Sequence, residues 1–156
     1  MIKAVCFPHA EDQFEDPEKL IEWLDTSLRT TNDGFYRYRE APGLGMLESG
    51  SIVFFYKKGF IVGSAVVEKS SRPLEQKEIE TCGKMEGTGD CENMVNIVKF
   101  FTNSIWVFGH YVVVNSEEFK KITNKDLIYY VTLEPEQVME LYAVVARKRA
   151  EIYRKS

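Results

Sequence analysis

Aromatic rings and guanidinium groups alternate in residues 34–40, which read Gly-Phe-Tyr-Arg-Tyr-Arg-Glu. Because side chains of an extended strand point alternately to its two faces, Phe35 and both arginines would share one face, opposite Tyr36 and Tyr38. Rings stack on nucleobases and arginine pairs with phosphate, so this pattern suits an unpaired or flipped nucleotide. The alternative is a half-buried edge strand whose tyrosines pack inside the protein and whose arginines are solvated.

Nucleophilic and metal chemistry find weaker support in the sequence. Cys6 and His9 are close enough for a thiolate–imidazole pair, but a buried strand cysteine followed by a loop histidine gives the same pattern. Eight residues separate Cys82 from Cys91, which is not a usual zinc spacing. The chain has no motif of a P-loop, a zinc protease or a serine hydrolase. The sequence therefore predicts no catalytic residue, no metal and no other cofactor.

Length and charge limit the class of protein. The 156 residues are 44% hydrophobic and 28% charged, which suits one folded domain spanning residues 1–156. No apolar run is long enough to cross a bilayer and the cysteine count is odd, so we expect a cytoplasmic protein with reduced thiols and no membrane partner. The formal net charge of −4 lacks general basicity, whereas cations gather in residues 147–155. Any nucleic-acid contact must then use a local patch.

Hydrophobic periodicity and turn residues define the expected elements. A capping acid and proline at Asp16 and Pro17 predict a helix whose apolar stripe ends at Leu28. Lys58 and Gly59 separate two β-branched runs and predict a tight hairpin. The basic C-terminal tail is expected to fray. The expected strands are 2–7, 51–57, 60–68, 93–101, 105–114 and 127–131, and two further helices are expected at 116–122 and from 134 onward.

These elements predict an α+β fold. Strands and helices do not alternate regularly, which argues against a doubly wound parallel sheet. A barrel-like sheet of five or more short strands with peripheral helices is the simplest packing. A long loop is expected over residues 80–92, which contain three glycines.

The predicted hairpin lies in a block that resembles a known family. Residues 47–67, Leu-Glu-Ser-Gly-Ser-Ile-Val-Phe-Phe-Tyr-Lys-Lys-Gly-Phe-Ile-Val-Gly-Ser-Ala-Val-Val, are similar to the central block of the PUA-like superfamily, and the EVE branch is the most similar. YTH and ASCH domains are related branches. The sequence departs from the pattern at Ser51, where the family usually has aspartate, and it lacks a clear match to the G-x-K-x-x-x-x-R motif of ASCH domains.

The resemblance implies a PUA-like β-barrel and a reader of RNA or DNA that takes a modified or flipped base into an aromatic-lined pocket. By position, the residues implied for the pocket are Trp23, Ser27, Asn32, Phe35, Tyr36 and Trp106. Those implied for a basic rim along the backbone are Arg37, Arg39, Lys57 and Lys58. Two other functions stay open: a protein-interaction module, with a protein partner or a homodimer, and a small nucleotide or small-molecule hydrolase on the same barrel.

Overall fold

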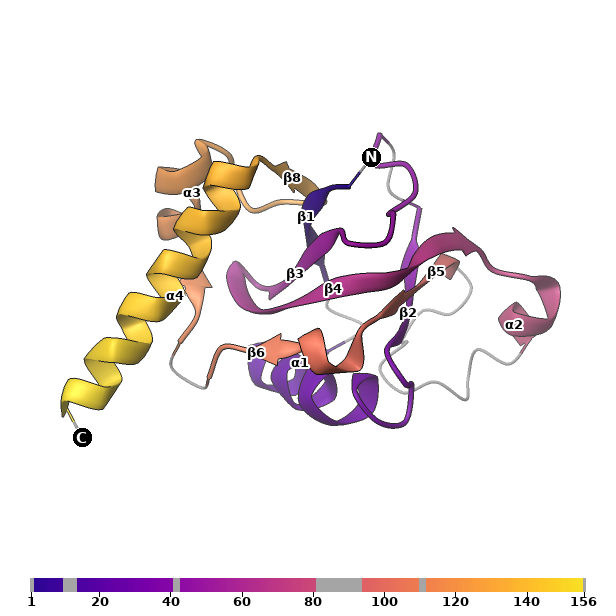
Figure 1. Cartoon of the computed structure of the whole chain (residues 1–156), viewed down its shortest axis with the longest axis horizontal. Coiled ribbons are helices and arrows are strands. Elements are labelled where there is room, and N and C mark those ends of the chain that lie inside the picture. Colours follow the sequence, from indigo (N-terminus) through magenta and orange to yellow (C-terminus); the bar gives the residue numbers. More distant parts are fainter. Residues whose placement is uncertain (1, 10–13, 41–42, 81–93, 110–111, 156) are drawn as a thin grey trace.

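The computed structural model describes residues 2–9, 14–40, 43–80, 94–109 and 112–155 (Figure 1). A π-helical turn at Leu24–Leu28 extends the first helix, and a 3-10 turn lies at Thr102–Ser104. The strands are β1 (Ala4–Pro8), β2 (Phe35–Arg39), β3 (Ile52–Lys57), β4 (Phe60–Pro73), β5 (Met94–Phe100), β6 (Trp106–Val107), β7 (Val114–Asn115) and β8 (Val131–Leu133). The helices are α1 (Pro17–Trp23), α2 (Gln76–Glu80), α3 (Ser116–Thr123) and α4 (Pro135–Lys155).

The eight strands form one mixed sheet in the order β2-β5-β4-β3-β1-β8, with β6 and β7 paired to β4. Only β1 and β3 run parallel among these pairs, in register from Ala4 opposite Ile52 to Pro8 opposite Tyr56. In the described residues the terminal strands β2 and β8 do not pair with each other, so the sheet is not closed and the expected barrel is corrected to an open sheet.

Aromatic side chains occupy the space where a closed barrel would join its two edges. The ring of Phe7 on β1 lies 5.1 Å from the ring of Tyr38 on β2 and 5.0 Å from that of Tyr130, just before β8. Stacked sheet layers need about 10 Å to hold side chains, whereas paired strands lie about 5 Å apart. These bulky rings therefore hold β2 away from β1 and β8.

The predicted hairpin is confirmed. Lys58 and Gly59 both have positive φ, 50° and 80°, which suits the turn to the right-handed twist of β3 and β4. Strand β4 is long enough to pair with β3 in its first half and with β5 in its second. Irregular pairing between Val67 and Lys69, and again before Arg72, bends it between the two partners.

Both faces of the central strands are buried. Along β3, Val53 and Phe55 face one apolar cluster that includes the helix α1, while Phe54 and Tyr56 face a second cluster with α3 and α4. This follows from the two-residue period of a strand and explains why residues 52–56 read as an almost continuous apolar run. Figure 1 shows α3 and α4 on one side of the sheet and α1 on another.

The predicted first helix is confirmed. The Asp16 side chain accepts a hydrogen bond from the Lys19 backbone N–H at 3.0 Å, and Pro17 takes the first helical position. Its predicted stripe is buried and consists of Leu20, Ile21, Trp23, Leu24 and Leu28.

Three expectations about elements are corrected. The C-terminal helix does not fray after its apolar stripe but continues to Lys155. In place of one strand over 105–114, only β6 and β7 form, and Gly109 with φ of 127° breaks the extended backbone between them. The strand expected at 127–131 begins instead at Val131, because Tyr129 has φ of 56°. The loop expected at 80–92 falls, apart from Glu80 at the end of α2, outside the described residues.

No helix in the described part of the chain combines the length and the apolar character needed to span a membrane.

Candidate functional site

A cavity of about 360 Å³ lies at the open seam of the sheet, between β2 and the ends of β1 and β8. Its volume lies within the range of about 300–1,000 Å³ that is usual for small-molecule sites. Four tyrosines and two arginines make up most of its wall, so aromatic rings and guanidinium groups are its main chemical features. Its lining consists of Pro8, His9, Tyr36, Arg37, Tyr38, Arg39, Glu40, Tyr129 and Tyr130. We call this cavity the seam cleft.

Buried hydrogen bonds fix one wall of the seam cleft. The Nδ1 atom of His9 lies 3.0 Å from the backbone carbonyl of Tyr56, and a carbonyl only accepts, so Nδ1 carries the proton. Nε2 then accepts from the Tyr36 hydroxyl at 2.7 Å. Burial lowers the pKa of His9 to about 4 and raises that of Tyr36 well above its ordinary value. Both groups are neutral at pH 7, and both hold their rings in one orientation.

Tyr129 displays its ring at the mouth of the seam cleft. The residue is 79% exposed, yet its backbone has φ of 56°, a left-handed conformation that costs a non-glycine residue about 1–2 kcal/mol. The Tyr56 hydroxyl donates a hydrogen bond to the Tyr129 carbonyl and holds this conformation. A large ring that is neither packed nor relaxed is typical of a functional position.

Tyr130 forms the wall opposite β2. Its ring meets Phe7 edge to face, and its hydroxyl donates to the Arg39 carbonyl at 3.5 Å, which links β2 to the segment before β8. Burial raises the pKa of Tyr130 to about 12, so the hydroxyl keeps its proton. Tyr129 and Tyr130 were not among the predicted site residues, because their apolar run was assigned to a strand. The signal was the unbroken pair of tyrosines directly after Ile128.

Arg37 brings a buried positive charge to the seam cleft. The residue is only 7% exposed, and its Nη1 donates to the Glu78 carbonyl at 2.8 Å. Its Nε atom is buried and has no hydrogen-bond partner among the described residues. Because this Nε is inaccessible to solvent, Arg37 acts on the cleft through its positive charge.

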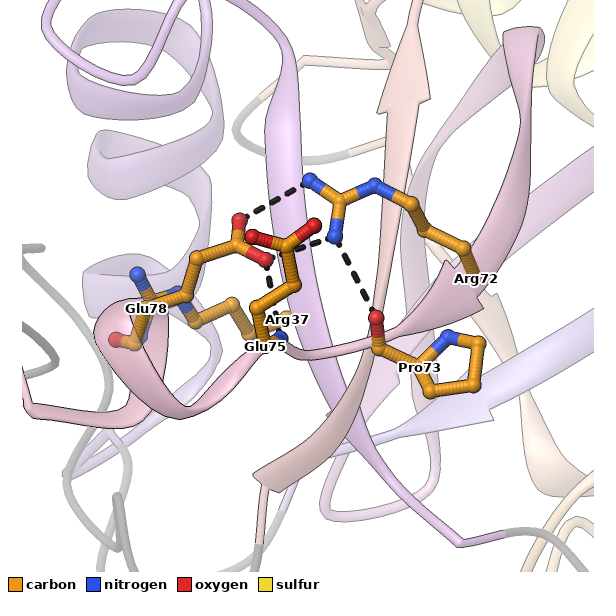
Figure 2. Close-up of polar contacts among 5 residues, drawn as sticks. All are labelled: Arg37, Arg72, Pro73, Glu75 and Glu78. Atoms are coloured by element: carbon orange, nitrogen blue, oxygen red, sulfur yellow. Dashed lines mark hydrogen bonds and ion pairs between the residues drawn. The ribbon is translucent and has the colours of Figure 1, made fainter.

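An ion pair between Arg72 and Glu78 ties α2 to β4 (Figure 2). Arg72 on β4 donates to both carboxylate oxygens of Glu78, at 2.6 and 2.9 Å, and one of these oxygens also accepts from the Glu75 backbone N–H at 3.0 Å. These bonds lower the pKa of Glu78 to about 2. They position the last turn of α2 so that the Glu78 carbonyl reaches Arg37.

The structure brings together only some of the predicted site residues. Tyr36, Arg37 and Arg39 all line the seam cleft. Trp23 and Ser27 line a separate, open depression on α1, although the Trp23 ring packs 5.9 Å from that of Tyr36.

The remaining residues predicted for the pocket lie away from the seam cleft. Asn32 is buried after α1, and the Phe35 ring lies under the Lys99 ammonium group at 5.6 Å. Trp106 is on β6, stacked on Tyr142 of α4, and does not close the far side of the cleft.

The two lysines predicted for the basic rim behave differently. Lys57 is only 1% exposed, and its ammonium group donates to the His9 carbonyl at 3.3 Å, so it supports the cleft from inside and does not form a rim. Lys58 is exposed and donates to the Glu15 carbonyl at 2.7 Å, on the side of α1.

The structure separates the thiol and the imidazole of the possible nucleophilic pair. Cys6 is fully buried in the apolar cluster of α3 and α4, and burial raises its pKa. His9 contacts Phe14, Tyr36 and Phe55 on the other side of the sheet. A buried thiol with a raised pKa is a poor nucleophile. The two other cysteines, Cys82 and Cys91, lie outside the described residues.

Comparisons with known proteins identify solved structures of similar architecture. No protein-family model matches the sequence, and no curated protein matches it. Among solved structures, the ASCH protein of Zymomonas mobilis superposes with a TM-score of 0.60 at 10% identity, over 90% of this chain and 94% of that one. A hypothetical protein from Leishmania major superposes with a TM-score of 0.56 at 11% identity, over 96% and 98% of the two chains.

The fold is ASCH-like. ASCH domains belong to the PUA-like superfamily, so the expectation of a PUA-like fold is confirmed at that level, with an open sheet in place of the barrel. At such low identity the likeness concerns the fold alone. The roles of individual residues in this ASCH-like chain therefore depend on its own seam cleft.

Proposed function

We propose that this ASCH-like protein binds single-stranded or locally unpaired RNA or DNA and takes one base into the seam cleft. The observation that carries the proposal is the arrangement of Tyr129 over a cavity with rigid tyrosine walls and a buried guanidinium. Stacking on an exposed ring holds a base of any sequence, and polar groups inside the cavity discriminate among base edges. The ASCH-like fold supports this function by analogy.

Each part of the seam cleft has a role in this proposal. Tyr129 stacks on the entering base, and the fixed rings of Tyr36 and Tyr130 set the width of the site. Arg37 places a positive charge beside the base, and Arg39 contacts the phosphate backbone. The acidic net charge permits this mode, because a pocket needs few backbone contacts.

The finer proposal concerns the base and the branch of the superfamily. We propose that the cleft prefers a modified base, as the EVE-like pattern of residues 47–67 implies. An apolar methyl group would lie against tyrosine rings that are already desolvated, which favours its burial. The cytoplasm remains the proposed location.

Fluorescence anisotropy with labelled short oligonucleotides tests the proposal. Single-stranded and duplex RNA and DNA, with plain, methylated and hydroxymethylated bases, are titrated at low and at physiological salt. We expect saturable binding of single strands, weakened about 10- to 100-fold by Tyr129→Ala, since stacking contributes about 1–3 kcal/mol per base. Tyr129→Phe retains the ring and should bind like the wild type.

Ile128→Ala is the matched control, because Ile128 is 55% exposed, lies next to Tyr129 and does not line the cleft. It should leave the affinity unchanged. Absence of binding to every oligonucleotide at low salt would contradict the proposal. Equal affinities of Tyr129→Ala and Ile128→Ala would also contradict the assigned role of the seam cleft.

A further inference from the structure

A second aromatic and cationic surface lies where β6 meets α4. The Trp106 ring is 38% exposed and stacks on Tyr142, with centroids 5.7 Å apart and an interplanar angle of 24°. The Arg149 guanidinium lies 5.8 Å from the centre of the Trp106 ring, and its Nη1 donates to the Phe108 carbonyl at 3.0 Å. Tyr142 and the Phe108 carbonyl thus hold the Trp106 ring and the Arg149 cation in place.

The exposed end of α4 extends this surface. Arg149 and Tyr153 follow Tyr142 by seven and eleven residues. At 100° per residue, each therefore lies within about 20° of Tyr142 around the helix axis. Tyr153 is 72% exposed, and every residue from 150 to 155 is exposed. Figure 1 shows this end of α4 pointing away from the sheet toward the C-terminus. We call Trp106, Arg149 and Tyr153 the α4 strip.

Positive charge lies at the outer end of the α4 strip. Arg154 and Lys155 are exposed there. At the inner end Arg29 donates to the carbonyl of Ile105, next to Trp106, but its charge is largely compensated by Asp25, as that of Lys148 is by Glu118. In a protein of net charge −4, this gathering of cations beside exposed rings is complementary to a polyanion with stackable groups.

We propose that the α4 strip is a second contact surface for single-stranded nucleic acid. Bases stack on Trp106 and Tyr153, and Arg149 and Arg154 pair with the phosphates between them. The face from Tyr142 to Tyr153 is about 16 Å long at 1.5 Å per residue, enough for more than one nucleotide. This inference rests on the proposed function, since the strip holds a strand whose other part enters the seam cleft. The two sites have no lining residue in common.

Tryptophan fluorescence reports on the strip directly. The chain has two tryptophans, so Trp23→Phe leaves Trp106 as the sole emitter. Titration of this variant with single-stranded oligonucleotides should quench Trp106 saturably. In the double variant with Tyr129→Ala, quenching should persist at lower affinity, because the strip still binds. If anisotropy shows binding while Trp106 emission stays unchanged, the strip is overturned and the seam cleft stands.

Paired substitutions on α4 give an independent test. Tyr153→Ala combined with Arg154→Gln should weaken the binding of oligonucleotides about tenfold. It should also reduce the slope of log affinity against log salt by about 0.7, for one lost phosphate contact. The control is Arg147→Gln, an exposed arginine about 140° around the helix from Tyr142, which should change neither quantity.

The remaining outcomes separate the two proposals. Quenching of Trp106 that Tyr129→Ala leaves wholly unchanged would support the strip and count against the seam cleft. No oligonucleotide binding by either method would overturn both. A variant of the strip that changes the oligomeric state in sedimentation but not the affinity for oligonucleotides would assign this surface to protein contact and overturn the inference.

Discussion

Two polar networks of different kinds meet at β2. In the buried network, Tyr36 donates to His9, which donates to the backbone of β3, and all three groups are buried and neutral. In the exposed network, Arg37 donates to the backbone of α2, and Glu78 of α2 forms an ion pair with Arg72 of β4, with side chains 22% and 47% exposed. Water can replace a lost partner in the exposed network but not in the buried one. The buried network therefore fixes geometry, and the exposed one holds a short helix in place at small energetic cost.

The pH dependence of unfolding should show the largest difference. The pKa of His9 is lowered from 6.5 to about 4 by burial, so the unfolded chain binds the proton more tightly than the folded one. The free energy of unfolding should fall by about 3 kcal/mol as the pH drops from above 6.5 to about 4. Denaturant titrations across this range measure the loss.

His9→Gln provides the control for this titration, because it keeps a polar side chain and removes the ionisable group. The variant should be less stable at pH 7 but lose less stability between pH 6.5 and 5.5, a range in which few carboxylates titrate. Parallel curves for wild type and variant would show that His9 is not held neutral in the folded state.

Substitution of the strained residue Tyr129 should raise the stability of the protein. Tyr129→Gly relieves a φ of 56° at a site where the side chain makes little packing contact, so we expect the free energy of unfolding to rise by about 1 kcal/mol. The same substitution removes the stacking ring and should weaken oligonucleotide binding. A gain in stability with a loss of binding is expected only where strain serves a function.

Lys58 provides the control for this substitution. It also has a positive φ, 50°, but it lies in the hairpin turn outside the cleft. Lys58→Gly should change stability by a similar amount and leave oligonucleotide affinity within about threefold, the effect of a single exposed cation. A loss of stability in Tyr129→Gly would contradict the assignment of strain.

The ion pair on the α2 side should give the smallest effect. Glu78→Gln should lower the free energy of unfolding by less than about 1 kcal/mol at low salt and by still less at high salt. Because the pKa of Glu78 is lowered to about 2, its contribution is present above pH 4.5 and is lost as the pH falls toward 2. Urea titrations at two salt concentrations measure it. A loss as large as that expected from His9 would remove the contrast between the two networks.

Local sequence signals predicted most elements, because their causes are local. The cap at Asp16, the glycine turn after Lys58 and the apolar stripe of the first helix each involve residues within a few positions of one another. The failures have a different cause. The end of α4 stays helical although residues 150–155 are all exposed, and the segment before β8 leaves the extended conformation at a tyrosine that a long-range hydrogen bond holds in place.

The candidate site was predicted in part. The alternation of rings and arginines identified Tyr36, Arg37 and Arg39, which lie on one strand and line one cavity. It could not identify Tyr129 or Tyr130, which reach the cleft from more than 80 residues away in the sequence. The family resemblance grouped Trp106 with the pocket by its position, but order along the chain does not say which side of a sheet a later strand will occupy.

The sequence by itself determined the α+β class and the almost continuous apolar run of β3, because both depend on short-range patterns. Only the tertiary structure decided that the sheet stays open, since the rings of Phe7, Tyr38 and Tyr130 meet at its seam from three distant segments. It likewise decided which charges are buried. Lys57 and Lys58 are neighbours in the chain, yet one lies inside the protein and the other in water, because Lys57 ends a strand that is covered on both faces and Lys58 lies in the hairpin turn.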